Sequence, residues 1–186
     1  MKYENLVESI EQETTPGAKA WEPDYTFSIL KQMAADKEFR RPSYIRFIHE
    51  PKLLVNPIRD LILFDNPILE TLTKSTWFMV PLGWLPCVFY YLYQSTFSLA
   101  NHEIFFLFIS ATLLWSFFEY MLHRFVFHGE HLWLPDYKPI MILHFLVHGI
   151  HHAFPQDRYR LVFPVVPGLF LLNLMFQLIF RAVFPE

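Results

Sequence analysis

The residues best suited to chemistry in this chain are its histidines. Seven of the nine lie in two neighbouring segments, HRFVFHGEHLW and HFLVHGIHH. These seven are His123, His128, His131, His144, His148, His151 and His152. Imidazole nitrogens bind zinc, iron and copper, and histidines without nearby cysteines disfavour a structural zinc finger. The two segments therefore predict an all-imidazole metal site.

Spacing decides which of these histidines can point at a common metal. His148, His151 and His152 lie at positions i, i+3 and i+4, which share one face of a helix. His123 and His128 are five residues apart, a separation of about 140° around a regular α-helix. We therefore expect the helix to end or bend between these two, with both rings turned inward.

The remaining histidines fit a simpler interpretation. We expect His49, His102 and His131 to be ordinary histidines with satisfied hydrogen bonds. His144 adds a further imidazole one helical turn before His148. Gly149, inside HGIHH, leaves room for another element to approach closely. If these histidines were only polar surface residues, the combination of HxxxxH and HxxHH, each at the end of an apolar run, would remain unexplained.

Composition excludes several classes of protein. Hydrophobic residues make up 53% of the 186 residues and charged residues only 18%, which is too apolar for a typical soluble domain. The single cysteine, Cys87, excludes disulfide scaffolds and thiolate zinc sites. A net charge of −3 without a long basic run excludes a nucleic-acid footprint. The polar first fifteen residues predict that no cleavable signal peptide opens the chain.

Three apolar runs predict an integral membrane protein. They cover about 77–97, 104–122 and 161–184, each close to the roughly 20 residues that cross a bilayer. Three buried helices of a soluble protein are the alternative, but so small a chain cannot cover them from all sides. The predicted fold is an all-α membrane helical bundle with a histidine-rich cap.

The basic residues predict the orientation of these spans. Ten precede the first run, none lies between the first and second, and four lie between the second and third. By the positive-inside tendency, the N-terminal arm and the histidine-rich cap both face the cytosol. We therefore divide the chain into a polar cytosolic arm, 1–65, and a membrane domain, 66–186.

Within the arm, the sequence predicts little regular structure. Residues 24–39 could form a short amphipathic helix, but we expect no hydrophobic core there. A stretch punctuated by Pro42, Pro51, Pro57 and Pro67 predicts extended or turning chain near a surface.

Several motifs together resemble one family. HxxxxH followed by HxxHH is the pattern of the histidine-box membrane hydroxylases, desaturases and sterol oxidases. The stretches EYMLHRFVFH, HFLVHGIHHAFPQDRYRLVFP and LETLTKSTWFMVPLGWLP resemble the fatty acid 2-hydroxylases, which hydroxylate sphingolipid acyl chains. The resemblance runs from about Asn66 to Pro164.

The resemblance implies a specific activity. It implies a two-metal centre, with iron in catalysis and zinc as the alternative, that uses O2 to hydroxylate carbon 2 of a long-chain fatty acyl or ceramide substrate. Electrons would come from cytochrome b5 or its reductase system. The protein would be a multi-pass membrane protein of the endoplasmic reticulum, with the site facing the cytosol. By motif, the metal ligands are His123, His128, His148, His151 and His152. His144 lies outside the HxxHH pattern, so the resemblance implies that it holds a ligand in place.

The chain also departs from this family. Relatives continue past the third span with a fourth span and further HxxxH and HxxHH boxes, whereas no histidine follows Leu161 here. Five ligands do not complete two coordination spheres, so we expect a truncated chain that is inactive alone. One alternative is a sterol or other lipid oxidase of the same superfamily, which RYRLVFP disfavours. The other is a non-catalytic membrane protein that binds one metal or partners a complete hydroxylase.

Overall fold

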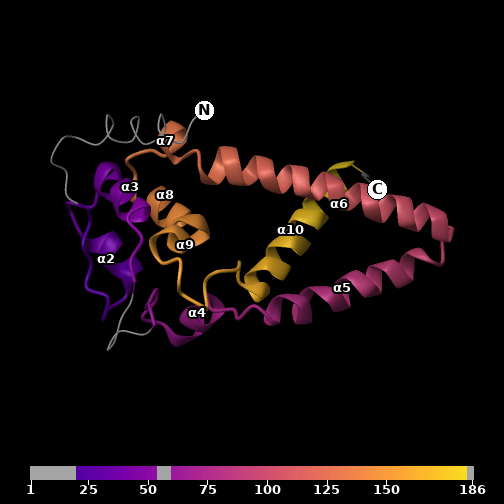
Figure 1. Cartoon of the computed structure of the whole chain (residues 1–186), viewed down its shortest axis with the longest axis horizontal. Helices are drawn as coiled ribbons and strands as arrows, with labels where there is room; N and C mark the ends of the chain where they lie inside the picture. Colours follow the sequence, from indigo (N-terminus) through magenta and orange to yellow (C-terminus); the bar gives the residue numbers. More distant parts are fainter. Residues whose placement is uncertain (1–19, 54–59, 184–186) are drawn as a thin grey trace. The chain divides into compact units, whose positions relative to one another are not determined.

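The computed structural model describes residues 20–53 and 60–183, and all regular structure in these ranges is helical (Figure 1). The predicted all-α class is therefore confirmed for this part of the chain. The helices are α2 (Ile29–Ala35), α3 (Arg41–His49), α4 (Pro67–Leu72), α5 (Met79–Ser95), α6 (Asn101–Met121), η1 (Leu122–Phe127), α7 (Glu130–Trp133), α8 (Lys138–His144), η2 (Phe145–Gly149), α9 (Ile150–Ala153) and α10 (Val165–Val183). The two segments labelled η are π-helical.

The chain divides into two compact units. The first combines the chain up to Pro67 with Phe117–Asp157, and the second combines Ile68–Ser116 with the chain from Arg158 onward. All seven clustered histidines belong to the first unit. The site is therefore built within one unit.

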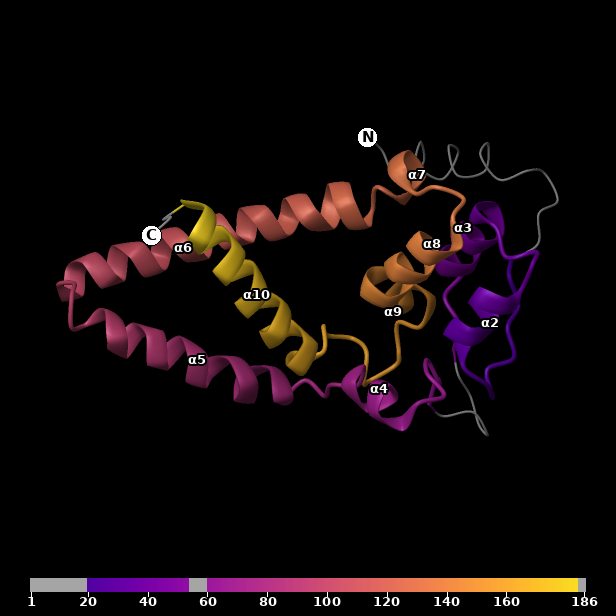
Figure 2. The same cartoon turned by 180° about the vertical axis from the view of Figure 1, so that it is seen from behind.

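The first unit packs the arm helices against the histidine-bearing helices. Helix α2 contacts α8, and α3 contacts α9, as both views show (Figures 1 and 2). Their shared core buries side chains from both parts of the chain. Its fully buried members include Ile29, Met33, Phe39, Tyr44, Phe47, Leu61, Met141 and Phe145.

The expectation that the arm lacks a core is therefore wrong. Ile29, Leu30 and Met33 give α2 a single buried stripe. That stripe packs against α8, more than 100 residues further along the chain. A partner so distant leaves no local signal, which is why periodicity within the arm did not reveal the core.

The expectation of extended or turning chain in the proline-rich stretch is wrong for its first part, whereas residues 50–53 and 60–66 do lack regular structure. Arg41–His49 forms the regular helix α3, and Pro42 lies in its first turn. Proline is tolerated there because the backbone N–H it lacks has no partner within the helix. Pro57 lies outside the described residues.

The second unit is organised by close contact between α5 and α10. A Cβ added at Gly83 would lie 2.4 Å from Val165 Cγ1, so only glycine permits this approach. The start of α10 is fixed further by the Val165 N–H, which donates to Ser75 Oγ at 3.1 Å. Nearby, Arg160 Nη2 pairs with Glu70 Oε1 at 2.5 Å.

One continuous helix in the described chain is long and apolar enough to cross a membrane. It combines α6 and η1, from Asn101 to Phe127, and none of its most apolar window is buried. An unburied apolar helix disfavours the alternative of a soluble-protein core. Helix α5 has 17 residues, and the apolar part of α10, Val165–Leu178, is shorter still. Membrane crossing by the runs 77–97 and 161–184 stays a prediction.

Phe47 tests the importance of the shared core. Its ring lies 5.2 Å from Trp21, 5.9 Å from Phe145 and 6.1 Å from Phe154 (centroid distances). We expect Phe47→Ala to lower the free energy of unfolding by about 3–5 kcal/mol, because it leaves a cavity. Chemical denaturation in detergent measures this value, with Phe27→Ala at an exposed position as the matched control. Equal losses for the two variants would contradict the assignment of the core.

Candidate metal centre

A π-helical turn brings the first two predicted ligands together. At Leu122–Phe127 the helix widens, and the His128 N–H donates to the His123 carbonyl at 2.9 Å, five residues back. This i→i+5 bond aligns residues that a regular α-helix would separate. The chain therefore stays helical up to His128, contrary to the expected end or bend between the two. Their ring centroids lie 4.8 Å apart and their Nε2 atoms 3.1 Å apart.

A second π-helical turn presents the other ligands. The segment η2, Phe145–Gly149, carries His148 and leads directly into α9. The His148 ring lies 4.4 Å from that of His151 and 4.7 Å from that of His152. The Nε2 atoms of His148 and His152 are 3.0 Å apart. These three rings therefore share one face, as their spacing predicts.

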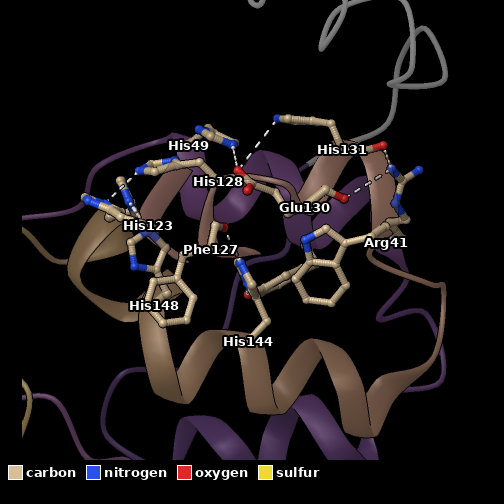
Figure 3. A network of polar contacts seen from close by, with 12 residues as sticks. Arg41, His49, His123, Phe127, His128, Glu130, His131, His144 and His148 are labelled. Carbon is tan, nitrogen blue, oxygen red and sulfur yellow. Dashed lines mark hydrogen bonds and ion pairs between the residues drawn. The ribbon is translucent and has the colours of Figure 1, made fainter. Parts of the chain in front are cut away.

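His148 is the meeting point of the two segments. Its ring centroid lies 5.0 Å from His123 and 4.8 Å from His128 (Figure 3). Two groups of three imidazole nitrogens result, each with its atoms within 4.8 Å of one another. The first is His123, His148 and His151, and the second is His128, His148 and His152. The structure thus gathers all five predicted ligands, and their binding of metal stays a prediction.

The spacing of the ring nitrogens fits a metal ion. Two histidine nitrogens at about 2.0–2.1 Å from a tetrahedral zinc lie about 3.3–3.4 Å from each other. The observed Nε2 separation of 3.0 Å between His148 and His152, which belong to one group, is within a few tenths of an ångström of this value. A group of three protein ligands would leave a position open on its ion, which is the arrangement of catalytic rather than structural sites.

Burial favours the neutral form of His128, His148, His151 and His152. It lowers the pKa of His148 to about 2, helped by the neighbouring rings of His151 and His152. Burial and the neighbouring His151 lower the pKa of His152 to about 4, and burial also lowers the pKa values of His128 and His151. Since a metal binds the unprotonated ring, no proton has to leave these residues at neutral pH.

His144 supports the cluster from behind. Its Nε2 lies 3.0 Å from the Phe127 carbonyl oxygen and its Nδ1 lies 2.6 Å from the Tyr44 hydroxyl. A carbonyl only accepts, so Nε2 carries the proton and Nδ1 accepts from the tyrosine. Both nitrogens are therefore engaged, and His144 fixes the backbone directly before His128.

Gly149 makes room for this support. A Cβ at Gly149 would lie 2.7 Å from the Tyr44 hydroxyl and 3.2 Å from Ile48 Cγ2. The glycine lets α3 approach the turn that carries His148, as the sequence predicts.

A third group of possible ligands was not predicted. His49 Nε2 lies 3.0 Å from Glu130 Oε1, and His131 Nε2 lies 3.7 Å from the same oxygen. The two rings are stacked with centroids 5.4 Å apart. His49 and His131 were expected to be ordinary histidines, and Glu130 was not singled out. The adjacent pair Glu130–His131 next to His128 was a local signal, but nothing pointed to His49, 81 residues away.

The fold and the site together define a class. An apolar helix long enough to cross a membrane leads directly into converging imidazoles, so the chain combines a candidate membrane span with a candidate metal site. No protein-family model matches the chain. The solved structure "Full length scs7p (only hydroxylase domain visible)" matches all of this chain and 64% of that chain, with a TM-score of 0.77 and 32% identity.

Curated relatives identify the family. Ceramide very long chain fatty acid hydroxylase SCS7 of Saccharomyces cerevisiae is 37% identical over 146 residues, covering 78% of this chain and 37% of the yeast protein. Human fatty acid 2-hydroxylase is 35% identical over 162 residues, covering 77% of this chain and 41% of the human protein. Dihydroceramide fatty acyl 2-hydroxylase FAH2 of Arabidopsis thaliana is 32% identical over 164 residues, covering 87% of this chain and 65% of the Arabidopsis protein.

The chain belongs to the fatty acid 2-hydroxylase family, which confirms the resemblance found in its motifs. It is shorter than its relatives and spans well under half the length of the yeast and human proteins.

Tyr44 tests the support behind the cluster. We expect Tyr44→Phe to lower the free energy of unfolding by about 1–3 kcal/mol, because His144 Nδ1 stays buried without a donor. Denaturation in detergent measures the change. Tyr137→Phe, at an exposed tyrosine, is the control and should leave stability unchanged. A Tyr44→Phe variant as stable as the control would show that this hydrogen bond does not hold His144.

Proposed function

We propose that the five clustered histidines form part of the metal centre of an acyl 2-hydroxylase that acts on sphingolipid precursors. The observation that carries this proposal is the convergence of both histidine segments on His148. Family membership supports it, because the relatives are named as hydroxylases of fatty acyl chains or ceramides. The proposed substrate is accordingly a long-chain acyl group, free or within a ceramide.

When bound, a redox-active metal such as iron would supply activation of O2. One oxygen atom would enter the acyl chain as the hydroxyl group on carbon 2, and the other would leave as water. This balance needs two electrons and two protons, and we propose cytochrome b5 as the electron donor. The protein's own share is to supply neutral ligand nitrogens, hold them in place and keep bulk water away. Burial of His148 serves all three purposes.

The proposed setting is the endoplasmic reticulum membrane, with the cluster on the cytosolic side. The helix from Asn101 to Phe127 supports membrane attachment, since it ends beside the cluster. The absence of basic residues between the first two apolar runs supports the orientation.

His148 belongs to both groups of three histidines, which limits how many metal ions the described ligands can bind. A neutral imidazole has one free lone pair, so His148 can complete only one of the two groups at a time. The five rings then offer three ligands to one ion and two to another. We therefore propose that this chain binds one ion tightly at the cluster and has no hydroxylase activity by itself.

His148 tests the proposed metal centre. We expect His148→Ala to weaken Zn2+ binding at the cluster by more than about 100-fold. This loss exceeds the one expected for a residue that only holds a ligand in place. The reason is that neither group then has three imidazoles. Competition with a chromophoric chelator measures the affinity of the purified chain in detergent.

Two variants serve as controls for His148. His151→Ala leaves the group of His128, His148 and His152 intact and should keep one tight ion. His102→Ala, at an exposed histidine in the first turn of α6, should bind as the unaltered chain does. Equal Zn2+ affinity of the His148→Ala and His102→Ala variants would contradict the proposed metal centre.

A chimera tests the reaction. In yeast lacking SCS7, we expect an SCS7 whose 146 aligned residues are replaced by those of this chain to produce 2-hydroxylated ceramides. The same chimera with His148→Ala should produce none, because its ligand set is broken. Mass spectrometry of extracted sphingolipids distinguishes these outcomes.

The chain expressed alone in the same cells should also give no product. Detectable 2-hydroxy ceramide from it would contradict the proposed limit set by His148. An inactive chimera that accumulates to the level of intact SCS7 and binds metal would contradict the proposed reaction.

A further inference from the structure

We propose that His49, Glu130 and His131 form an additional binding site for a divalent transition-metal ion, separate from the two all-imidazole groups. The three side chains offer two imidazole nitrogens and a carboxylate within 4.8 Å of one another. Two histidines and one carboxylate are a ligand set that proteins use for zinc and for non-haem Fe(II), with positions left open. This proposal does not depend on the proposed function, since it concerns metal binding alone.

The carboxylate is built into the site rather than exposed beside it. The side chain of Glu130 is only 3% exposed, and its Oε2 is buried without a hydrogen-bond partner in the described chain. A buried carboxylate oxygen without a partner is costly, so it calls for a cation or a donor that the described residues do not supply. A metal ion beside Oε2 would meet that need.

The distances around Glu130 suit coordination. A tetrahedral ion with nitrogen and oxygen ligands at about 2.0–2.2 Å separates its ligands by about 3.3–3.6 Å. The observed separations of 3.0 Å to His49 Nε2 and 3.7 Å to His131 Nε2 lie on either side of this range. Figure 3 shows both rings directed at the same carboxylate. The side chain of His49 is 28% exposed, which gives a bound ion access to water.

The backbone that carries two of these ligands is held independently. Arg41 Nη2 donates to the carbonyl of His131 at 2.7 Å and more weakly to that of Glu130 at 3.4 Å. The Arg41 N–H also donates to Asp136 Oδ1 at 2.9 Å. Helix α3 therefore fixes the Glu130–His131 turn at its first residue and supplies His49 at its last. Such preorganisation lowers the cost of gathering three ligands around an ion.

The simplest competing explanation is an ion pair between a protonated His49 and Glu130. It accounts for the 3.0 Å contact, but it leaves Glu130 Oε2 unexplained. A second competing explanation is that Glu130 only supports the neighbouring cluster, since the His49 and His152 rings lie 6.4 Å apart. Counting bound metal separates all three explanations.

The experiment uses the full chain in detergent, stripped with chelator, reloaded with Zn2+ and desalted. We expect Glu130→Gln to hold one equivalent fewer than the unaltered chain by elemental analysis. This change keeps the shape and an oxygen acceptor for His49 but removes the charge. His131→Gln should lose the same equivalent, and His102→Gln should lose none. Circular dichroism verifies that each variant remains folded.

A double variant makes the test independent of the main cluster. If the sites are separate, Glu130→Gln should remove one further equivalent from the His148→Ala chain. Full Zn2+ content in the Glu130→Gln variant overturns the proposal and favours the ion pair. A loss that disappears in the His148→Ala background also overturns it, and assigns Glu130 to support of the cluster. Neither result affects the proposed function.

Discussion

The structure depends on holding five imidazole rings in one small volume. Imidazole rings do not attract one another strongly. Burying an imidazole nitrogen is costly unless it has a hydrogen-bond partner or a bound metal. The scaffold must therefore impose their convergence. Two π-helical turns do so, η1 for His123 and His128 and η2 for His148. Such turns are rare and concentrate at functional sites, because they realign side chains without ending the helix.

Helix α3 keeps this arrangement in place, although it precedes the cluster by more than 70 residues. Its residues Arg41, Tyr44 and His49 contact, in turn, the Glu130–His131 backbone, His144 and the Glu130 carboxylate. Phe47, on the same helix, packs in the core against Trp21 and against Phe145 of the histidine-bearing segment. The arm is thus part of the site's scaffold rather than a separate polar extension.

The sequence was most informative where short-range geometry decides the outcome. The HxxHH spacing predicted that His148, His151 and His152 share one face, and they do. The HxxxxH spacing predicted a bend where a π-helical turn formed, since residue type alone does not distinguish the two. The arm core and the group around Glu130 were missed for another reason. Both depend on contacts across roughly 80 to 110 residues, which no local pattern in a single sequence encodes.

The position of the cluster along its helix also bears on the chemistry. A helix of 27 residues is about 40 Å long, whereas the hydrocarbon core of a bilayer is about 30 Å thick. If its first turn lies at one surface, the last six or seven residues, which include η1, extend beyond the hydrocarbon on the other side. Carbon 2 of an acyl chain is adjacent to its carbonyl group and so lies at this same boundary. Under the proposed function the metal ligands have to lie at this interface, and a helix that crosses the bilayer with His123 near its end would place them there.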